Sequence, residues 1–273
     1  MMAKVISVYN LKGGTGKTFL AHILTAYLAY KGYKVLAVDL DQQANFTVSL
    51  VPQQSLSLIS QVNISHLFYP QKYKSDPDKL LVGTVIPDVD LLAATLDLAE
   101  REMDAYTIPQ SSERLKMFID LIKDDYDYVV VDNPPAFNIY TTNGFIASDH
   151  VVIPVYPSVF AIEGLEKVVK ILINMVDFNP RLSITAIVPN MIDKRYKMHN
   201  ATIKYLQHLY DAELTKPIGR RSEYQKILDD VGKSRFLKML KNPSEDIREL
   251  IEVLDEIITK IETRVPQEEI ANG

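Results

Sequence analysis

Residues 5–18 read VISVYNLKGGTGKT, and the architecture expected for the whole chain follows from this segment. Its first six residues are mostly apolar and β-branched, which predicts a short buried strand before a glycine-rich turn. From Thr18 onward, apolar residues recur at helical spacing, and Gly32 stands where a helix C-cap is expected. A strand, a glycine-rich turn and a helix in this order form the setting of a phosphate-binding loop.

The segment KGGTGKT supplies the groups that hold the phosphates of a nucleotide. Gly13, Gly14 and Gly16 let the backbone turn tightly and point successive N–H groups at phosphate oxygens. The N-terminus of the following helix adds its partial positive charge. We expect Lys17 to bridge the β- and γ-phosphates of ATP and the Thr18 hydroxyl to ligate Mg²⁺. The ATP-binding residues expected here are Lys12, Gly13, Gly14, Thr15, Gly16, Lys17, Thr18 and Phe19.

Four further apolar segments predict buried strands separated by helices. They cover residues 35–40, 128–131, 151–155 and 182–188. Continuous apolar strands that alternate with helices predict a mostly parallel, twisted sheet with helices on both faces. The expected fold class is therefore α/β in three layers, as in P-loop NTPases.

A single domain is expected over residues 1–265, followed by a disordered tail over residues 266–273. Between residues 51 and 110 prolines interrupt the pattern, and we interpret this stretch as surface elaboration of the same domain. A last long helix is expected over roughly residues 244–263, with apolar side chains along one side.

Composition excludes several kinds of function. The chain contains no cysteine, which excludes disulfides, thiolate catalysis and cysteine ligands for zinc or an iron–sulfur cluster. No window approaches 18 consecutive apolar residues, so we expect no membrane span, and no targeting segment is expected before the first strand. The net charge of −5 does not favour indiscriminate binding of nucleic acid by the chain as a whole. A cytoplasmic location is expected.

Carboxylates follow two of the expected strands. Asp39 and Asp41 lie two residues apart in VDLDQQAN, so both point to one face and reach one site at the end of the strand. Asp132 directly follows YDYVVV, the position of an acid that binds Mg²⁺ beside a phosphate-binding loop. Strand-end acids can also cap the following loop, and this alternative stays open for Asp39 and Asp41.

Lys12 makes the loop unusual, because an ordinary phosphate-binding loop has no required lysine five residues before its P-loop lysine. With this lysine the chain resembles the ParA/MinD group of ATPases, and within it the partition ParA (Soj-like) proteins, over roughly residues 3–260. The segment VDLDQQAN resembles the family's DxDPQ, with Gln42 in place of proline, and YDYVVVDNPP resembles YDYIIIDxPP. Residues 157–164 (PSVFAIEG) and 189–195 (PNMIDKR) resemble two further segments of the family.

The resemblance implies roles for single residues. Lys12 would reach across a nucleotide-sandwich homodimer to the partner's ATP. Asp41 would orient the attacking water, while Asp39 would support the Mg²⁺ shell that Thr18 and Asp132 provide. Asn190 would read the adenine, and Gly219 replaces a family proline in a segment that packs on the base. The catalytic residues implied are Lys12, Lys17 and Asp41.

Relatives with this loop have different functions, and composition separates some of them. A nitrogenase-type reductase is excluded because its cluster needs cysteine ligands. A MinD-like regulator, which positions a protein or membrane-associated cargo without binding DNA, needs a basic amphipathic C-terminal helix. Residues 242–273 instead carry nine acids and three bases, which an anionic membrane repels. This regulator stays the alternative, and a ligase of the dethiobiotin synthetase kind stays a further one.

Residues 194–241 carry twelve lysines and arginines and five acids within a chain of net charge −5. Such asymmetry indicates a localised basic surface. With the resemblance, it predicts binding of nonspecific double-stranded DNA in the ATP state, nucleoid association, and a ParB-like adaptor that stimulates slow hydrolysis. A basic face without nucleic-acid contact stays open. The expected DNA contacts are Arg220, Arg221, Lys233, Arg235, Lys238 and Lys241.

Overall fold

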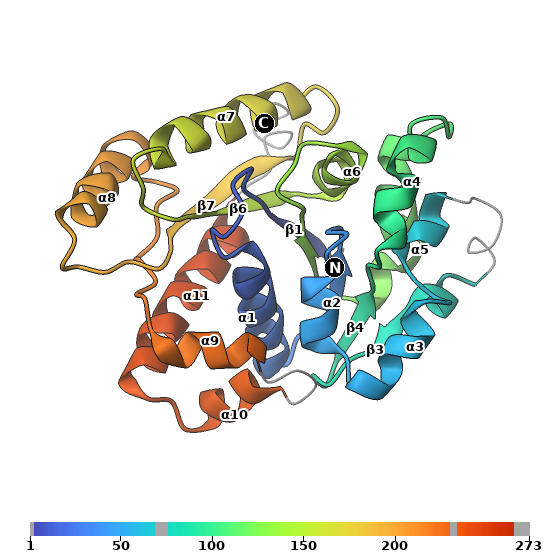
Figure 1. Ribbon diagram of the computed structural model, residues 1–273, viewed down its shortest axis with the longest axis horizontal. Coiled ribbons are helices and arrows are strands. Elements are labelled where there is room, and N and C mark those ends of the chain that lie inside the picture. Colours follow the sequence, from blue (N-terminus) through green and yellow to red (C-terminus); the bar gives the residue numbers. More distant parts are fainter. Residues whose placement is uncertain (1–2, 69–75, 230–233, 265–273) are drawn as a thin grey trace.

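The computed structural model describes residues 3–68, 76–229 and 234–264 (Figure 1). Its centre is a seven-stranded sheet with the strand order β3-β4-β2-β5-β1-β6-β7. All neighbouring strands run parallel except β3 and β4, which are antiparallel. The strands are β1 (Lys4–Val8), β2 (Val35–Asp39), β3 (Val82–Gly83), β4 (Val89–Leu92), β5 (Tyr128–Asp132), β6 (His150–Val155) and β7 (Ser183–Pro189).

Eleven α-helices surround the sheet within the described residues. They are α1 (Lys17–Tyr30), α2 (Asn45–Leu50), α3 (Leu56–Ile59), α4 (Asp97–Ala105), α5 (Arg114–Ile122), α6 (Ile139–Ala147), α7 (Ala161–Met175), α8 (Lys197–Tyr210), α9 (Ser222–Asp229), α10 (Arg235–Lys241) and α11 (Glu245–Thr263). Short 3₁₀ turns occupy Gln53–Ser55, Ile64–Phe68, Pro77–Leu80, Ser111–Glu113 and Lys123–Asp125.

Helices cover both faces of the sheet because alternate residues of each strand point to opposite sides. Ile6 and Val130 belong to the core under α1, α9, α10 and α11, whereas Val5 and Val129 belong to the core under α4, α5 and α6 (Figure 1). On this second side, Ile153 of β6 packs under α7. The expected three-layer α/β fold with a mostly parallel sheet is confirmed.

Local sequence explains where two important helices begin. α1 begins at Lys17, directly after Gly16, whose φ of 93° suits glycine and few other residues. α11 begins after Ser244, whose Oγ accepts the Ile247 N–H at 3.3 Å and so caps the helix. These two helices pack in the same core on one side of the sheet.

Residues 51–110 are more than surface elaboration, and that interpretation is corrected. They contribute β3 and β4 to the sheet, and β4 lies inside it, with Leu91 fully buried. The four residues of β4 are too few for a clear alternation of apolar and polar positions. Parallel pairing with β2, a segment distant in sequence, makes β4 a strand.

The strands expected from the sequence are present, with ends that differ by up to two residues. The assignment of residues 1–265 to one domain stays a prediction, and residues 266–273 lie outside the described part of the chain. In the part of the chain that the structure describes, no helix has both the length and the apolar character needed to cross a bilayer.

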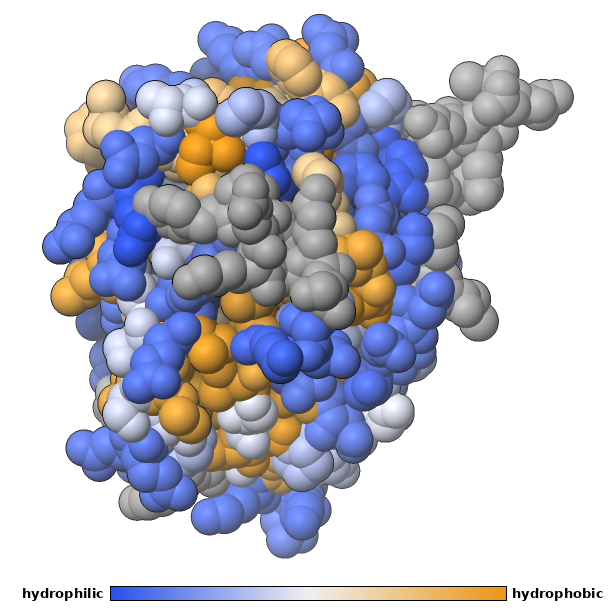
Figure 2. Space-filling model, turned by 90° about the vertical axis from the view of Figure 1, so that its right-hand side faces the viewer, coloured by the Kyte–Doolittle hydropathy of each residue, from blue (hydrophilic) through white to orange (hydrophobic). Residues whose placement is uncertain are grey.

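The face that carries α3, α4 and α5 shows apolar surface among hydrophilic surroundings (Figure 2). Leu58 on α3, Met103 on α4 and Leu121 on α5 are more than half exposed. Single exposed apolar residues are common on protein surfaces, so this face by itself indicates no partner.

Candidate nucleotide-binding site

The expected site residues meet at the edge of the sheet where β1, β2 and β5 end. Asp39 at the end of β2 is the register neighbour of Asp132 at the end of β5, and Val8 of β1 is the neighbour of Asp132 on the other side. The glycine-rich loop follows β1, so it begins beside both carboxylates. Ligands of open parallel sheets bind outside the carboxyl ends of the strands. The edge where β1, β2 and β5 end is therefore the candidate site, and it is called the phosphate edge.

The glycine-rich loop is open and shaped to bind an anion. Gly14 and Gly16 have φ values of 72° and 93°, which place them in the left-handed region. A Cβ added at Gly13 or Gly14 would meet no atom within 4 Å, so the space beside the loop is free. Within the described residues, no backbone N–H of residues 13–16 donates a hydrogen bond. Unpaired N–H groups that border open space are suited to phosphate oxygens.

Asn10 fixes the start of this loop, a role that the sequence did not assign. Its Oδ1 accepts the Lys12 N–H at 3.0 Å, and its Nδ2 donates to the Pro154 carbonyl oxygen at 2.8 Å. The signal for this role is an amide that directly follows an apolar strand. The residue ties the loop to the end of β6.

Lys17 places a positive charge in a nearly dry position. It is 7% exposed, and its Nζ donates to the Lys12 carbonyl oxygen at 3.2 Å. Burial lowers the pKa of the Lys17 ammonium, while the charges of Asp132 and Asp41 act in the opposite direction. Among the described residues the ammonium has no ion-pair partner within 4.0 Å, so an arriving phosphate group would stabilise it.

Thr18 and Asp132 contact each other across the site. The Thr18 Oγ1 donates to Asp132 Oδ2 at 2.7 Å, and Asp132 Oδ1 is buried without a hydrogen-bond partner in the described part of the chain. Burial and the neighbouring Asp39 raise the pKa of Asp132 above its ordinary range. Mg²⁺ in nucleotide sites takes one or two protein oxygens and completes its shell with phosphate and water. The hydroxyl and the unpartnered carboxylate oxygen fit such an ion.

Asp39 holds the backbone after β2. One carboxylate oxygen accepts the Asp41 N–H at 3.0 Å, and the other accepts both the N–H and the hydroxyl of Thr47 at 2.8 Å. Burial, opposed by these hydrogen bonds, raises the pKa of Asp39 to about 7. The geometry favours the loop-capping alternative for Asp39, and its support of the Mg²⁺ shell stays a prediction. By fixing the backbone, Asp39 positions Asp41, whose role with water also stays a prediction.

Four of the expected ATP-binding residues line one pocket of about 590 Å³, the nucleotide pocket. They are Gly14, Phe19, Asn190 and Gly219. Tyr156 and Tyr224 also line it, and the Tyr224 ring stacks on Phe19 with 5.9 Å between centroids. A volume of this size with aromatic walls suits a nucleotide base and its ribose. The two tyrosines were missed because an isolated aromatic residue, whether on a helix, as Tyr224 is, or just after a strand, as Tyr156 is, usually indicates core packing.

Asn190 contacts the glycine-rich loop. Its Nδ2 donates to the Thr15 carbonyl oxygen at 2.9 Å, and its Oδ1 accepts the Met191 N–H at 2.8 Å. A Cβ on Gly16 would lie 2.1 Å from this Nδ2, so only glycine allows the contact. The amide therefore supports the loop, and the reading of adenine by Asn190 stays a prediction.

Lys12 extends away from its own loop. Its Nζ donates to the Ser158 hydroxyl at 3.2 Å, in the PSVFAIEG segment that follows β6. Two of the segments that carried the family resemblance therefore touch within one chain. The reach of Lys12 to a partner's nucleotide stays a prediction.

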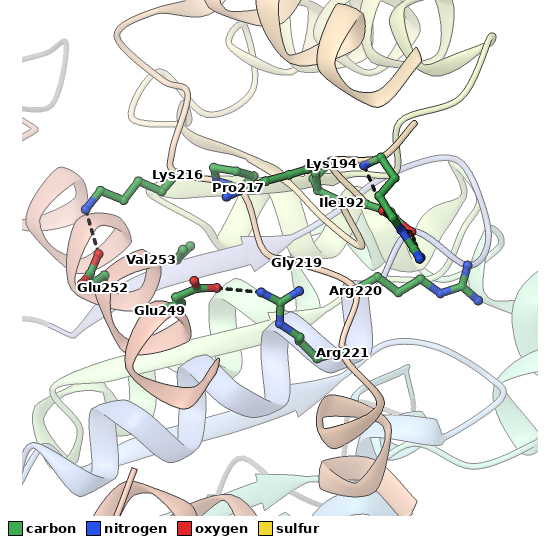
Figure 3. Close-up of a pocket in the computed structure, with 12 residues that line it drawn as sticks. Ile192, Lys194, Lys216, Pro217, Gly219, Arg220, Arg221, Glu249, Glu252 and Val253 are labelled. Atoms are coloured by element: carbon green, nitrogen blue, oxygen red, sulfur yellow. Dashed lines mark hydrogen bonds and ion pairs between the residues drawn. The ribbon is translucent and has the colours of Figure 1, made fainter. Parts of the chain in front are cut away.

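The expected DNA-binding residues fall in two places. Arg220 and Arg221 line a second pocket of about 480 Å³, here called the basic pocket, together with Lys194, Arg195 and Lys216 (Figure 3). Arg235, Lys238 and Lys241 lie on α10, which does not line this pocket, and Lys233 lies outside the described residues. The segment of residues 219–221 lines both the nucleotide pocket and the basic pocket.

Comparisons with known proteins agree with this geometry. A family model described as an AAA domain matches residues 3–184. The sporulation initiation inhibitor protein Soj of Bacillus subtilis is 31% identical over 219 residues, which cover 80% of this chain and 84% of Soj. The chromosome partitioning protein ParA of Caulobacter vibrioides is 30% identical over 224 residues, which cover 79% and 81% of the two chains. The chain belongs to the ParA/Soj family of partition ATPases.

Solved structures show the same fold. A cobyrinic acid a,c-diamide synthase from Mycobacterium smegmatis, solved with a bound ATP analog and magnesium, is 26% identical with a TM-score of 0.73, over 88% of this chain and 94% of that one. An apo McdA from Cyanothece has a TM-score of 0.77 at 19% identity, over 94% and 99% of the chains. The comparisons support a P-loop NTPase whose site suits a nucleotide and Mg²⁺.

Proposed function

We propose that this protein binds Mg-ATP at the phosphate edge and hydrolyses it slowly. The observation that carries the proposal is the contact between Thr18 and Asp132, with an unpartnered carboxylate oxygen beside the buried Lys17. Bound Mg²⁺ would supply charge neutralisation for the phosphates, and Thr18 and Asp132 are the residues that would hold it. Lys17 stabilises the charge on the transferred phosphoryl group, and the loop N–H groups orient it.

Hydrolysis requires a positioned water, and Asp41 is the candidate for this role. Asp41 is 9% exposed at the phosphate edge, and its Oδ1 accepts the Gln43 N–H at 2.9 Å. The Asp39 carboxylate fixes the Asp41 backbone, so the side chain is held at the end of β2. Slow turnover suits a nucleotide switch, in which the bound state rather than the rate of hydrolysis supplies the function.

We further propose that the ATP state is a homodimer that binds nonspecific double-stranded DNA and that a ParB-like adaptor stimulates hydrolysis. The support is the basic pocket, which shares residues 219–221 with the nucleotide pocket, and the partitioning function in the names of the relatives. In the dimer Lys12 leaves Ser158 and reaches the partner's nucleotide. The function is segregation of a plasmid or a chromosome, in the cytoplasm on the nucleoid.

The MinD-like alternative receives no support from α11. The apolar face of this helix is already buried in the core under the sheet. A helix that used this face on a membrane would have to leave the fold. The described part of α11 is therefore a structural helix with an acidic outer face.

The proposal is tested by binding of random-sequence duplex DNA without nucleotide, with ADP and with ATP. The variant Asp41→Ala holds the ATP state, and light scattering on the same samples reports the dimer. The expected result is salt-sensitive binding with ATP alone, by a dimer. Equal binding in all three states would contradict nucleotide gating, and no binding in any state would remove the DNA role while leaving the ATPase assignment intact.

A further inference from the structure

A row of carboxylates on α11 faces the basic pocket. Asp246, Glu249, Glu252 and Glu256 recur every three or four residues, so they share one side of the helix, and this set is called the acidic row. The other side of α11 carries its buried residues, among them Ile247, Leu250, Leu254, Ile258 and Ile261. The acidic row therefore stays at the surface, next to the segment of residues 216–221.

The acidic row binds two bases of the pocket directly. The Arg221 Nε donates to Asp246 at 2.5 Å and its Nη2 to Glu249 at 3.1 Å. The Lys216 Nζ donates to Glu252 at 2.9 Å, and the Lys216 backbone N–H donates to Glu256 at 2.9 Å. Every member of the row thus contacts the segment that forms the pocket wall.

The remaining bases of the pocket differ in their partners. Arg195 is held by Asp193, with its Nη2 2.6 Å from the carboxylate. Lys194 and Arg220 have no ion-pair partner among the described residues, and both are exposed. Figure 3 shows Arg221 directed toward Glu249 and Arg220 directed away from it. The pocket therefore contains free bases and bases that carboxylates already occupy.

The ion pairs to the acidic row are exposed enough to exchange. The side chains of Lys216 and Glu252 are 64% and 60% exposed, and those of Arg221 and Glu249 are 35% and 52% exposed. Exposed ion pairs contribute little to stability because water and salt screen them. A phosphodiester group offers an arginine the same paired oxygens as a carboxylate. A phosphate can therefore take the place of a carboxylate without unfolding α11.

We propose that the acidic row is an internal competitor of DNA for the basic pocket. The carboxylates occupy Arg221 and Lys216 in the free protein, Arg220 and Lys194 make the first contacts, and backbone phosphates then displace Glu249 and Glu252. This inference rests on the proposed function. The competition lowers affinity for DNA in every nucleotide state, which keeps release from DNA easy after hydrolysis.

The test removes the competitor and measures binding of random-sequence duplex DNA. The double variant Glu249→Gln/Glu252→Gln is compared with the unsubstituted protein, both in the Asp41→Ala background with ATP. We expect about 10-fold tighter binding. The slope of log affinity against log salt concentration should also become more negative by about one to two. Glutamine keeps the size of each side chain, and Asp246, in the first turn of α11, stays in place.

A matched control separates local competition from net charge. The variant Asp120→Asn/Asp255→Asn makes the same change in charge at exposed carboxylates that pair with Lys116 and Lys31, away from the basic pocket. The proposal expects this control to bind DNA nearly as the unsubstituted protein does. Equal gains in the two double variants would overturn the proposal, since net charge alone would then explain them, and no gain in either would overturn it as well.

A second probe keeps the test decisive if the DNA role itself fails. Heparin is a polyanion that binds the same exposed bases through charge, whether or not the protein acts in partition. If no variant binds DNA in any nucleotide state, the proposed DNA role is wrong, the comparison of DNA affinities does not apply, and elution from a heparin column decides the competition. If Glu249→Gln/Glu252→Gln elutes later than both the control variant and the unsubstituted protein, competition by the acidic row is supported. If the two double variants elute together, it is refuted.

Discussion

The phosphate edge and the basic pocket both gather charges, but they do so in opposite ways. At the phosphate edge Lys17 and Asp132 are 7% and 1% exposed, and few charges are present. In the basic pocket the charges are numerous and exposed, and most are already paired. Buried charges act strongly over short distances and select one small ligand, whereas screened charges bind an extended polyanion in many registers. The first region suits a nucleotide, and the proposal assigns the second to DNA that is bound and then released.

The largest effect is expected at the buried lysine. Lys17→Ala should weaken ATP binding by about 1,000-fold, because two charge-assisted hydrogen bonds to phosphate are lost. Lys216→Ala, an exposed lysine of the basic pocket, should leave ATP affinity within about threefold. Calorimetric titration of both variants checks the comparison. Equal losses in the two variants would show that the regions do not differ as described.

The next largest effect concerns hydrolysis alone. Asp41→Ala should lower the turnover of ATP by about 100-fold, because the attacking water loses its orienting group. Affinity for ATP should change little, since Lys17 and the loop N–H groups remain. Phosphate release and calorimetry measure the two quantities separately. Unchanged turnover would assign the water to another group at the phosphate edge.

A buried histidine of α1 should also make stability depend on pH. His22 of α1 contacts the Ser49 hydroxyl at 2.9 Å, and burial lowers its pKa to about 4. The unfolded chain binds a proton near pH 6.5 that the folded state excludes, so stability is complete above this pH and falls as the pH drops toward 4. When the pH falls from about 7.5 to about 5, the exclusion of this proton by His22 should lower the free energy of unfolding by about 2 kcal/mol.

Urea unfolding of the parent protein and His22→Gln at both pH values isolates this contribution. His150, whose pKa burial also lowers to about 4, is present in both proteins and cancels. The loss of stability on acidification should be smaller in the variant by about 2 kcal/mol. The same loss in both proteins would mean that His22 accepts a proton in the folded state.

The smallest effect is expected for a single exposed base. Arg220→Ala should weaken DNA binding about threefold to tenfold and reduce the salt slope by about one, since one phosphate contact is lost. Lys79→Ala, which removes an exposed lysine of a 3₁₀ turn, is the control and should change neither quantity. Titrations of duplex DNA at several salt concentrations provide the measurement. Weaker ATP binding with unchanged DNA binding would show that Arg220 acts on the nucleotide pocket, which it also lines, and not on DNA.

The phosphate edge was predictable from sequence because its chemistry is local. A glycine-rich turn needs contiguous residues, and Asp39 and Asp132 follow their strands directly. The fourth strand β4 was not predictable, because four residues show no period and only pairing with β2 defines the strand. The loop-holding contacts of Asp39 with Thr47 and of Asn190 with Thr15 likewise arise from tertiary packing.

The basic pocket was predictable only in part. The excess of bases in residues 194–241 indicated a basic surface, but not that Lys194, Arg195 and Lys216 would join Arg220 and Arg221. The acidic row could not be paired with these bases from sequence, since Arg221 and Asp246 are 25 residues apart and a helix must fold back to bring them together.

The decisive test of the metal site is the Mg²⁺ dependence of ATP binding in Asp132→Asn. Calorimetric titrations with and without Mg²⁺ are compared between this variant and the parent protein. The contact between Thr18 and Asp132 predicts that Mg²⁺ strengthens ATP binding in the parent and that the variant loses about 10-fold or more of this gain. The same gain from Mg²⁺ in both proteins would contradict the assignment of the metal to the phosphate edge.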